Sequence, residues 1–229
     1  MRRSLTIATA FLMLAVPAFA EDASNLNPGI TTSEILDTAP VHWVSVGQIE
    51  ASLQDQAPTT VGFDVDDTVL FSSPCFYYGK AKYSPTSEDY LKMDAFWTDI
   101  HTNNCDQYSI PKEVARHLID MHTARGDTIY FITGRTRGSG GETLTAAIKK
   151  DFGIEKMNDV VFTASSENKV QFLKDHKLTI YYGDADSDMK AAIAAGIRPI
   201  RVMRAQNSTY KPDPKNGKFG EEVIVNSTN

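Results

Sequence analysis

The sequence predicts an α/β fold: a doubly wound, mostly parallel sheet with helices on both faces and a small aromatic-rich cap. From residue 110 onward, short apolar runs rich in Val, Ile, Phe and Tyr alternate with helical segments. This alternation is typical of a parallel sheet that is covered on both faces. The second observation is a long aromatic-rich segment over 72–109, which interrupts the alternation. Segments of this length are commonly lids or insertions.

The first twenty residues have the features of a secretory signal peptide. Arg2 and Arg3 precede an apolar stretch over 5–16, and Ala18-Phe19-Ala20 has the small-x-small pattern of a cleavage site. The apolar stretch is short for a bilayer-spanning helix, although an uncleaved anchor is the alternative. We therefore predict a signal peptide over 1–20, export to the periplasm, and one domain over 21–229 that stays off the membrane after cleavage.

The elements that follow are predicted from periodicity and from helix start and stop signals. Ser45 and Gln48 have capping-box spacing and predict a short helix. The apolar run at 59–65 predicts a buried strand, and Val114, Leu118 and Met121 have helical spacing. Further strands are predicted over 127–134, 159–164, 178–184, 199–205 and 221–226, and helices over 111–126, 141–153, 168–177 and 187–196.

The segment over 72–109 holds more aromatic residues than a plain loop needs: Phe76, Tyr77, Tyr78, Tyr90, Phe96 and Trp97. We predict a cap over the carboxyl edge of the sheet, the alternative being a small side core. The chain has two cysteines, Cys75 and Cys105. In an exported protein they could form a disulfide or remain two buried thiols, because sequence alone does not bring them within bonding distance.

The charge of the chain argues against one class of partner. The net charge is −6, and it becomes −8 once Arg2 and Arg3 are removed with the signal peptide, with 21 basic against 29 acidic residues. Proteins that bind nucleic-acid polymers have a basic surface instead. A phosphate group on a small substrate would therefore need a metal ion or a few well-placed cations.

Charged and polar residues follow the predicted strands at one edge. Asp64 and Asp66 end the first strand, Thr133-Gly134 ends the second, Lys169 lies in the helix after the third, and Asp184 ends the fourth. The carboxyl ends of parallel strands meet at one edge, where ligands bind. Carboxylates from two strands form a hard oxygen site suited to Mg²⁺. The cation would also relieve the repulsion between these acids.

This combination suits phosphoryl transfer. Asp64 can attack phosphorus to form an aspartyl-phosphate, while Asp66 protonates the leaving oxygen and later deprotonates water. Thr133 with a backbone N–H can bind phosphoryl oxygens, and Lys169 supplies positive charge. Simpler interpretations exist for three neighbouring residues: Asp67 as a turn residue, Arg135 as a surface cation and Asp188 as an acid at a helix N-terminus.

The motifs FDVDDTVL, FITGR, the isolated Lys169 and YYGDADSD resemble the four motifs of the haloacid dehalogenase superfamily of phosphohydrolases. Longer blocks, APVHWVSVGQIE, SPTSEDYLK, IPKEVARHLIDMH and GEEVIVNS, resemble the bacterial class B nonspecific acid phosphatases over nearly the whole mature chain. The resemblance implies periplasmic homotetramers that use one Mg²⁺ per subunit. They would hydrolyse diverse phosphomonoesters (nucleotides, sugar and aryl phosphates), and some would transfer phosphate to alcohols.

The same resemblance assigns roles to residues. It makes Asp64 the nucleophile and a metal ligand, Asp66 the general acid/base and a ligand through its backbone carbonyl, and Asp184 the third ligand. Thr133, Gly134 and Lys169 would hold phosphate, with Asp188 in the outer metal shell. Aromatic residues that would stack on the substrate's organic group are Phe76, Tyr90, Trp97 and Tyr210. Two features depart from the family pattern: the cysteine pair and the glycine-rich stretch TRGSGGET (136–143).

Two other functions share some of these features. A receiver-like phospho-acceptor module also combines an acidic pocket, a hydroxyl group, a lysine and Mg²⁺ on an α/β sheet, but it needs neither Asp66 as an acid nor an export signal. A periplasmic solute-binding protein would retain its ligand without hydrolysis, and this chain is short for two equal lobes. Multiple turnover would distinguish an enzyme from both.

Overall fold

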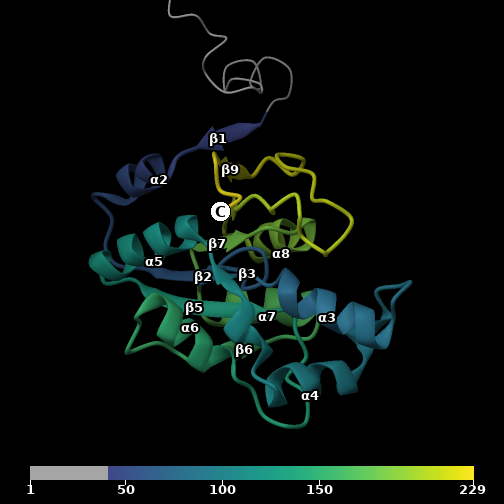
Figure 1. Cartoon of the computed structure of the whole chain (residues 1–229). Helices are drawn as coiled ribbons and strands as arrows, with labels where there is room; N and C mark the ends of the chain where they lie inside the picture. The colour runs from purple at the N-terminus through teal and green to yellow at the C-terminus, as the bar shows by residue number, and fades with distance from the viewer. Residues whose placement is uncertain (1–40) are drawn as a thin grey trace, which may run out of the picture.

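A computed structural model describes residues 41–229, and the predicted signal peptide lies outside the described residues. The main sheet has seven strands in the order β1-β9-β8-β7-β2-β5-β6 (Figure 1). Every neighbouring pair in it is parallel. Its strands are β1 (His42–Val44), β2 (Thr60–Phe63), β5 (Thr128–Thr133), β6 (Val161–Phe162), β7 (Ile180–Gly183), β8 (Arg198–Arg201) and β9 (Glu222–Ile224).

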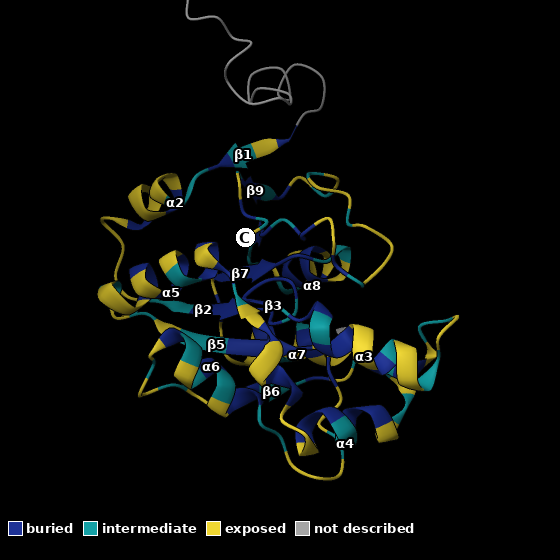
Figure 2. Cartoon of the chain, viewed as in Figure 1, coloured by how far each residue is buried: buried dark blue, intermediate teal, exposed yellow. Residues whose placement is uncertain are grey.

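Helices cover both faces of this sheet, so the predicted fold class is confirmed. Side chains of β2, β5 and β7 alternate between the faces: Phe131 and Tyr182 belong to one core cluster, Ile132 and Tyr181 to the other. The first cluster contains residues of α2 (Val46–Leu53), α5 (Glu113–Arg125) and α6 (Leu144–Phe152), and the second contains residues of α7 (Ser166–Asp175) and α8 (Asp186–Ala195). Figure 2 shows the central strands buried between these layers.

The predicted helix signals are found where the sequence placed them. The Ser45 N–H donates to the Gln48 side chain (2.8 Å) and the Gln48 N–H donates to Ser45 Oγ (3.2 Å), which is the capping box that begins α2. Gly126 ends α5 at φ +77° and Gly153 ends α6 at φ +66°, in the left-handed region that glycine adopts without a steric cost. Strand β1 was not predicted, because three residues are too few to show periodicity.

The segment between β3 (Leu70–Phe71) and β4 (Ile110–Pro111) forms a structured insertion, which we call the cap. The two short strands pair antiparallel, so the chain leaves and re-enters the domain at one point. The cap contains α3 (Ser73–Tyr83), η2 (Asp89–Lys92), α4 (Asp94–Thr102) and η3 (Cys105–Tyr108). These helices were not predicted from the sequence.

The cap has an aromatic core of its own. Phe96 packs edge-on against Tyr90 (4.9 Å between ring centroids) and tilted against Trp97 (4.8 Å). Gly79 of α3 lies directly over the Phe96 ring, where a Cβ would come within 2.1 Å of it. Cys75 and Cys105 form a disulfide that links α3 to η3, with their Cα atoms 5.7 Å apart. Among residues 41–229, no helix is long and apolar enough to cross a membrane.

Candidate active site

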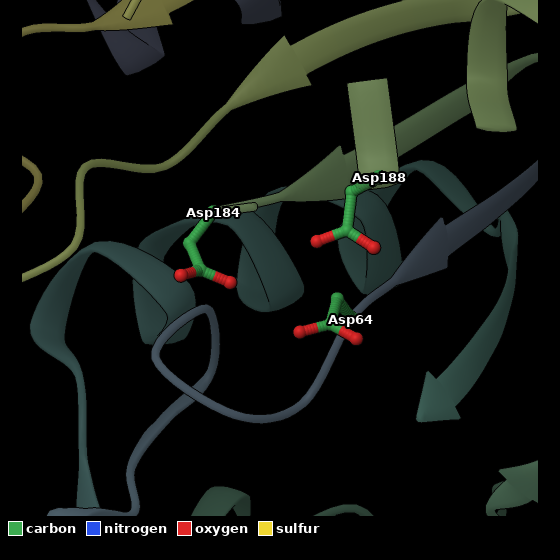
Figure 3. Close-up of side chains that lie close together, drawn as sticks. All are labelled: Asp64, Asp184 and Asp188. Carbon is green, nitrogen blue, oxygen red and sulfur yellow. The ribbon is translucent and has the colours of Figure 1, made fainter. Parts of the chain in front are cut away.

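The carboxyl ends of β2 and β7 bring three carboxylates together (Figure 3). Asp64 follows β2, Asp184 follows β7, and Asp188 lies in the first turn of α8. All three are buried, and one oxygen from each carboxylate lies within 4.8 Å of the other two. The Asp64 N–H donates to the Tyr182 carbonyl (2.8 Å), which continues the β2–β7 pairing up to the site. The rule that the carboxyl ends of parallel strands meet at one edge of the sheet thus placed Asp64 and Asp184 correctly at that edge.

Lys169 lies between two members of this group. Its Nζ donates to Asp64 Oδ1 (3.0 Å) and to Asp188 Oδ1 (2.7 Å), and it is itself buried. The neighbouring carboxylates raise the pKa of Lys169 in spite of the opposing effect of burial, so the ammonium stays charged. Asp188 also accepts from the Ala185 N–H (3.1 Å), as an acid at a helix N-terminus does, while its burial and its bond from Lys169 add a second role.

Arg204 is a second shared cation and was not predicted from the sequence. Its Nε donates to Asp184 Oδ2 (2.5 Å) and lies 3.6 Å from Asp67 Oδ2. Arg204 follows β8, the neighbour of β7, so the same rule for strand ends could have identified it. Asp67 also accepts from Ser208 Oγ (2.6 Å) and has φ +58°, so it anchors the C-terminal segment as well as shaping the turn.

Arg135 is the third shared cation and is buried, not a surface residue. Its Nη2 donates to Asp66 Oδ1 (2.7 Å) and to Asp106 Oδ1 (2.9 Å), and its Nη1 donates to Asp106 Oδ2 (2.9 Å). Burial alone would raise the pKa of Asp66, but the charge and hydrogen bonds of Arg135 outweigh burial and hold that pKa below its ordinary value. Asp106 belongs to the cap, and no sequence signal that we used pointed to it.

Each of these three cations is shared by two carboxylates, so six acids outnumber three cations in the direct ion pairs. The buried Lys112, whose Nζ donates to the Asp67 carbonyl (2.9 Å), adds one more positive charge and leaves the acids in excess. Burial and the nearby Asp188 raise the pKa of Asp64 well above its ordinary value. Burial raises the pKa of Asp184 to about 7. A compact group of carboxylate oxygens with unbalanced negative charge matches the ligand preference of a hard divalent cation. The donor set therefore fits a metal of the Mg²⁺ type.

These side chains open onto a pocket of about 290 Å³. The cap supplies Phe76, Leu91 and Trp97 to its lining, and the C-terminal segment supplies Tyr210. Three of the four predicted aromatic residues thus lie at the pocket. The fourth, Tyr90, is fully buried in the cap core and does not line the pocket, so its ring has no free face for a substrate.

Two of the predicted phosphate-binding residues lie at the carboxyl end of β5, where Thr133 is the last residue and Gly134 follows it. Gly134 lines the pocket, and a Cβ at this position would meet nothing within 4 Å, so its backbone is accessible to a ligand. Thr133 is buried behind it, where its Oγ1 accepts from the Arg135 N–H (3.1 Å) and donates to Asp66 Oδ2 (3.3 Å). In the glycine-rich stretch, the Ser139 N–H donates to Thr98 Oγ1 (3.3 Å), which joins this loop to α4 of the cap.

Comparison with known proteins agrees with this geometry. Residues 36–213 match the family model described as HAD superfamily, subfamily IIIB (acid phosphatase). The class B acid phosphatase of Salmonella arizonae is 54% identical over 92% of this chain and 90% of its own length. The class B acid phosphatase of Haemophilus parainfluenzae is 48% identical over 98% of this chain and 99% of its own.

Solved structures support the fold alone. A Bacteroides vulgatus protein described as a candidate beta-phosphoglucomutase has a TM-score of 0.52 at 15% identity, covering 80% of this chain and 90% of its own. A Clostridium difficile protein described as a candidate phosphatase has a TM-score of 0.51 at 12% identity, covering 74% and 95%. The family match and the curated relatives confirm the resemblance found in the sequence. The chain belongs to the class B acid phosphatases, subfamily IIIB of the HAD superfamily, and is an enzyme that hydrolyses phosphomonoesters.

Proposed function

We propose that hydrolysis proceeds through a phosphorylated Asp64. The Asp64 carboxylate attacks phosphorus, the bond from phosphorus to the ester oxygen breaks, and the leaving oxygen takes a proton from Asp66. Asp66 then takes a proton from water, the water oxygen attacks phosphorus, and inorganic phosphate leaves with Asp64 restored. The observation that carries this proposal is that Asp64 lies at the pocket beside Lys169 and opposite Asp184, with Asp66 two residues on.

We propose that the site holds one Mg²⁺ per subunit. Asp64 and Asp184 would bind it through carboxylate oxygens and Asp66 through its backbone carbonyl, while Asp188 would hold the ligands in place from the outer shell. When bound, the ion screens the repulsion between the nucleophile and the phosphate oxygens. Lys169 adds a fixed positive charge on the same side, and the backbone N–H of Gly134 would donate to the phosphoryl oxygens. Thr133 Oγ1 would join it only by exchanging its hydrogen bond to Asp66 for one to phosphate.

We propose a broad range of substrates, including nucleotides, sugar phosphates and aryl phosphates. The polar end of the pocket would bind the phosphoryl group that these compounds share. Phe76, Trp97 and Tyr210 provide an apolar wall that favours no single organic group. An alcohol bound at this wall in place of water would accept the phosphoryl group, so we also propose a transferase side reaction.

We also propose that the protein is exported to the periplasm, cleaved after Ala20 and assembled as a homotetramer. The N-terminal residues support export, and the family resemblance supports the assembly. The mass of the protein purified from a periplasmic fraction tests the first point, because a chain that begins at Glu21 is expected. Light scattering on the same sample tests the second, and a monomeric mass would overturn the assembly.

Turnover of an aryl phosphate by the wild type and Asp64→Asn, with Mg²⁺ and with EDTA, tests the mechanism. The wild type should turn over many times and lose activity in EDTA, and added Mg²⁺ should restore it. Asp64→Asn should fold, retain binding of inorganic phosphate and show no turnover. Full activity in Asp64→Asn would refute the nucleophile. A single turnover in the wild type would indicate a phospho-acceptor module.

A further inference from the structure

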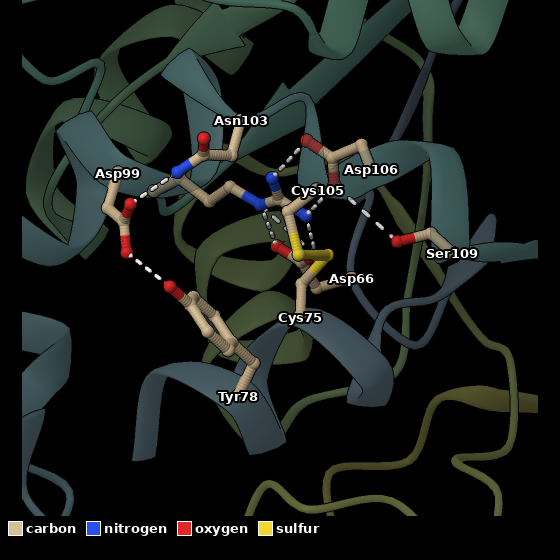
Figure 4. Close-up of a disulfide and its surroundings, with 9 residues drawn as sticks. Asp66, Cys75, Tyr78, Asp99, Asn103, Cys105, Asp106 and Ser109 are labelled. Atoms are coloured by element: carbon tan, nitrogen blue, oxygen red, sulfur yellow. Dashed lines mark hydrogen bonds and ion pairs between the residues drawn. A yellow bond between two sulfur atoms is a disulfide. The ribbon is translucent and has the colours of Figure 1, made fainter. Parts of the chain in front are cut away.

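We propose that Arg135 and Asp106 position Asp66 for proton transfer, and that the Cys75–Cys105 disulfide holds Asp106 in place. The inference rests on the proposed role of Asp66 as the general acid and base. It makes the cap part of the catalytic machinery at the leaving-group end of the reaction. Figure 4 shows the disulfide close to Asp106 and Asp66, and Arg135 donates hydrogen bonds to both of these carboxylates.

The first link is the pairing of Arg135 with Asp66. The guanidinium donates through Nε to both oxygens of Asp66 (3.2 and 3.0 Å) and through Nη2 to Oδ1 (2.7 Å). A paired, fork-like contact of this kind fixes the plane of the carboxylate as well as its position. Thr133 Oγ1 donates to the other side of the same carboxylate (3.3 Å). Asp66 thus has one defined orientation at the edge of the pocket.

The second link is Asp106, which binds the adjacent edge of the same guanidinium, formed by Nη1 and Nη2. Both of its oxygens accept from Arg135 at 2.9 Å, and its side chain is fully buried. Removing one partner from a buried ion pair is strongly destabilising, because the other charge is left without compensation. Asp106 therefore needs Arg135, and Arg135 is held from the cap side by Asp106. The Phe76 ring of α3 lies 5.4 Å from the guanidinium and closes its face.

The third link is the disulfide. Cys105 directly precedes Asp106 in η3, and Cys75 directly precedes Phe76 in α3. The bond joins two points thirty residues apart and so brings both neighbours of Arg135 to one place. A cross-link beside Asp106 restricts the movements by which η3 could carry this carboxylate away from Arg135.

The chemical consequence is specific to the leaving group. A nitrophenolate is a weak base and departs with little help from an acid, whereas an alkoxide is a strong base and needs a proton during departure. Misplacing an acid by about 1 Å can cost about 100-fold in rate. Loss of Asp106 should therefore slow hydrolysis of alkyl phosphates far more than that of nitrophenyl phosphate. A merely structural role would slow both equally.

The experiment measures kcat/KM for nitrophenyl phosphate and for glycerol phosphate with saturating Mg²⁺. Asp106→Asn keeps the shape of the side chain, Cys75→Ser with Cys105→Ser removes the cross-link, and Asp66→Asn removes the acid itself. Asp99→Asn is the matched control, because Asp99 is a cap carboxylate bound by Tyr78, Tyr83 and Lys82 and does not contact Arg135. Melting temperatures are measured for every variant.

We expect Asp106→Asn to lose about 30-fold or more on glycerol phosphate and less than about 3-fold on nitrophenyl phosphate. The double serine variant should show a smaller loss, of about 5-fold, with the same selectivity. Equal losses on both substrates in Asp106→Asn would overturn the positioning role. Unchanged kinetics in the double serine variant would overturn the part of the disulfide.

Two further arms keep the inference separate from the proposed function and from misfolding. If Asp66→Asn loses equal activity on glycerol phosphate and on nitrophenyl phosphate, the proposed role of Asp66 fails. If Asp66→Asn loses more activity on glycerol phosphate but Asp106→Asn does not, only the positioning role of Asp106 fails. Arg135→Ala should regain activity on glycerol phosphate when free guanidinium is added. An absence of this recovery in a folded variant would count against Arg135 as a positioning residue.

Discussion

Gly183→Ala is predicted to displace Asp188 and to disturb both stability and catalysis. Gly183 is the last residue of β7 and lies directly beneath the first turn of α8. A Cβ added there would lie 2.4 Å from Asp188 Cβ and 2.7 Å from Asp188 Cγ. Carbon atoms pack favourably at about 3.5–4.0 Å, so Asp188 must withdraw by about 1 Å.

The size of the effect follows from the contacts that Asp188 would lose. A retreat of about 1 Å breaks its hydrogen bonds with Lys169 (2.7 Å) and with the Ala185 N–H (3.1 Å). Overpacking costs about 1–3 kcal/mol and the lost contact at the helix start about 1 kcal/mol more. The free energy of unfolding should therefore fall by about 2–4 kcal/mol. Because Lys169 also loses a partner that orients it toward Asp64, kcat should fall by about 100-fold.

Chemical denaturation and steady-state kinetics measure the two effects. Gly47→Ala is the control: the nearest atom to its added Cβ is Ser45 Oγ at 3.9 Å, and alanine in helix α2 should stabilise by about 0.5–1 kcal/mol. Adding Gly183→Ala to an Asp188→Gly background should cost less than about 1 kcal/mol, since the clash is gone. A Gly183→Ala variant within about 0.5 kcal/mol of the wild type would refute the close packing of β7 against Asp188.

Three other predictions concern the pocket wall, the core and the metal. Tyr210→Leu should raise KM for nucleoside and aryl phosphates by about 3- to 10-fold and change KM for glycerol phosphate little, because Tyr210 lines the pocket and its ring packs on Arg204. Equal changes in KM for both classes of substrate would contradict a stacking role of Tyr210. Burial lowers the pKa of His122 in the folded chain. Between the unfolded pKa of about 6.5 and this lower folded pKa, only the unfolded chain binds a proton at His122, so the free energy of unfolding should decrease as the pH is lowered through this range. Denaturation curves of the wild type and of His122→Asn at several pH values test this, and the same pH dependence in both would contradict it. Asp127, whose carboxylate lies 2.7 Å from His122 Nδ1, adds a further loss of stability below about pH 4, because burial acts to raise its pKa but the hydrogen bond with His122 helps to lower it below its ordinary value. Mg²⁺ at about 100 times its Kd should stabilise the wild type by about 2.7 kcal/mol and Asp184→Asn by much less, and equal thermal shifts would contradict the ligand assignment.

The fold and half of the site could be predicted because they depend on local patterns. Apolar runs of strand length alternating with helical periodicity specify a parallel sheet, and such a sheet collects its strand-end residues at one edge. Asp64 and Asp184 are therefore readable from the sequence. The capping box at Ser45 and the glycine stops at Gly126 and Gly153 are equally local.

The cap was harder to predict, because its helices do not bury a regular apolar stripe. In α3 the buried positions are Ser73, Cys75, Phe76 and Gly79, while Tyr77 and Tyr78 are exposed. This helix packs through small residues and one aromatic ring, so its sequence lacks the usual amphipathic period. Asp106 was missed for a related reason: its burial depends on Arg135, which is distant in the sequence, and no spacing rule connects the two.

The three shared cations explain why the site needs segments from the whole chain. Lys169 joins Asp64 and Asp188 within the α/β domain, Arg204 joins Asp184 to the C-terminal segment, and Arg135 joins Asp66 to the cap. Each cation thus links one strand-end carboxylate to a different part of the chain: helix α8, the C-terminal segment or the cap. Because every cation is shared by two acids, none neutralises its strand-end carboxylate fully, and the negative excess remains where the substrate phosphate must bind. A site built this way would repel a substrate phosphate, so we expect a divalent cation to be needed for substrate binding as well as for chemistry.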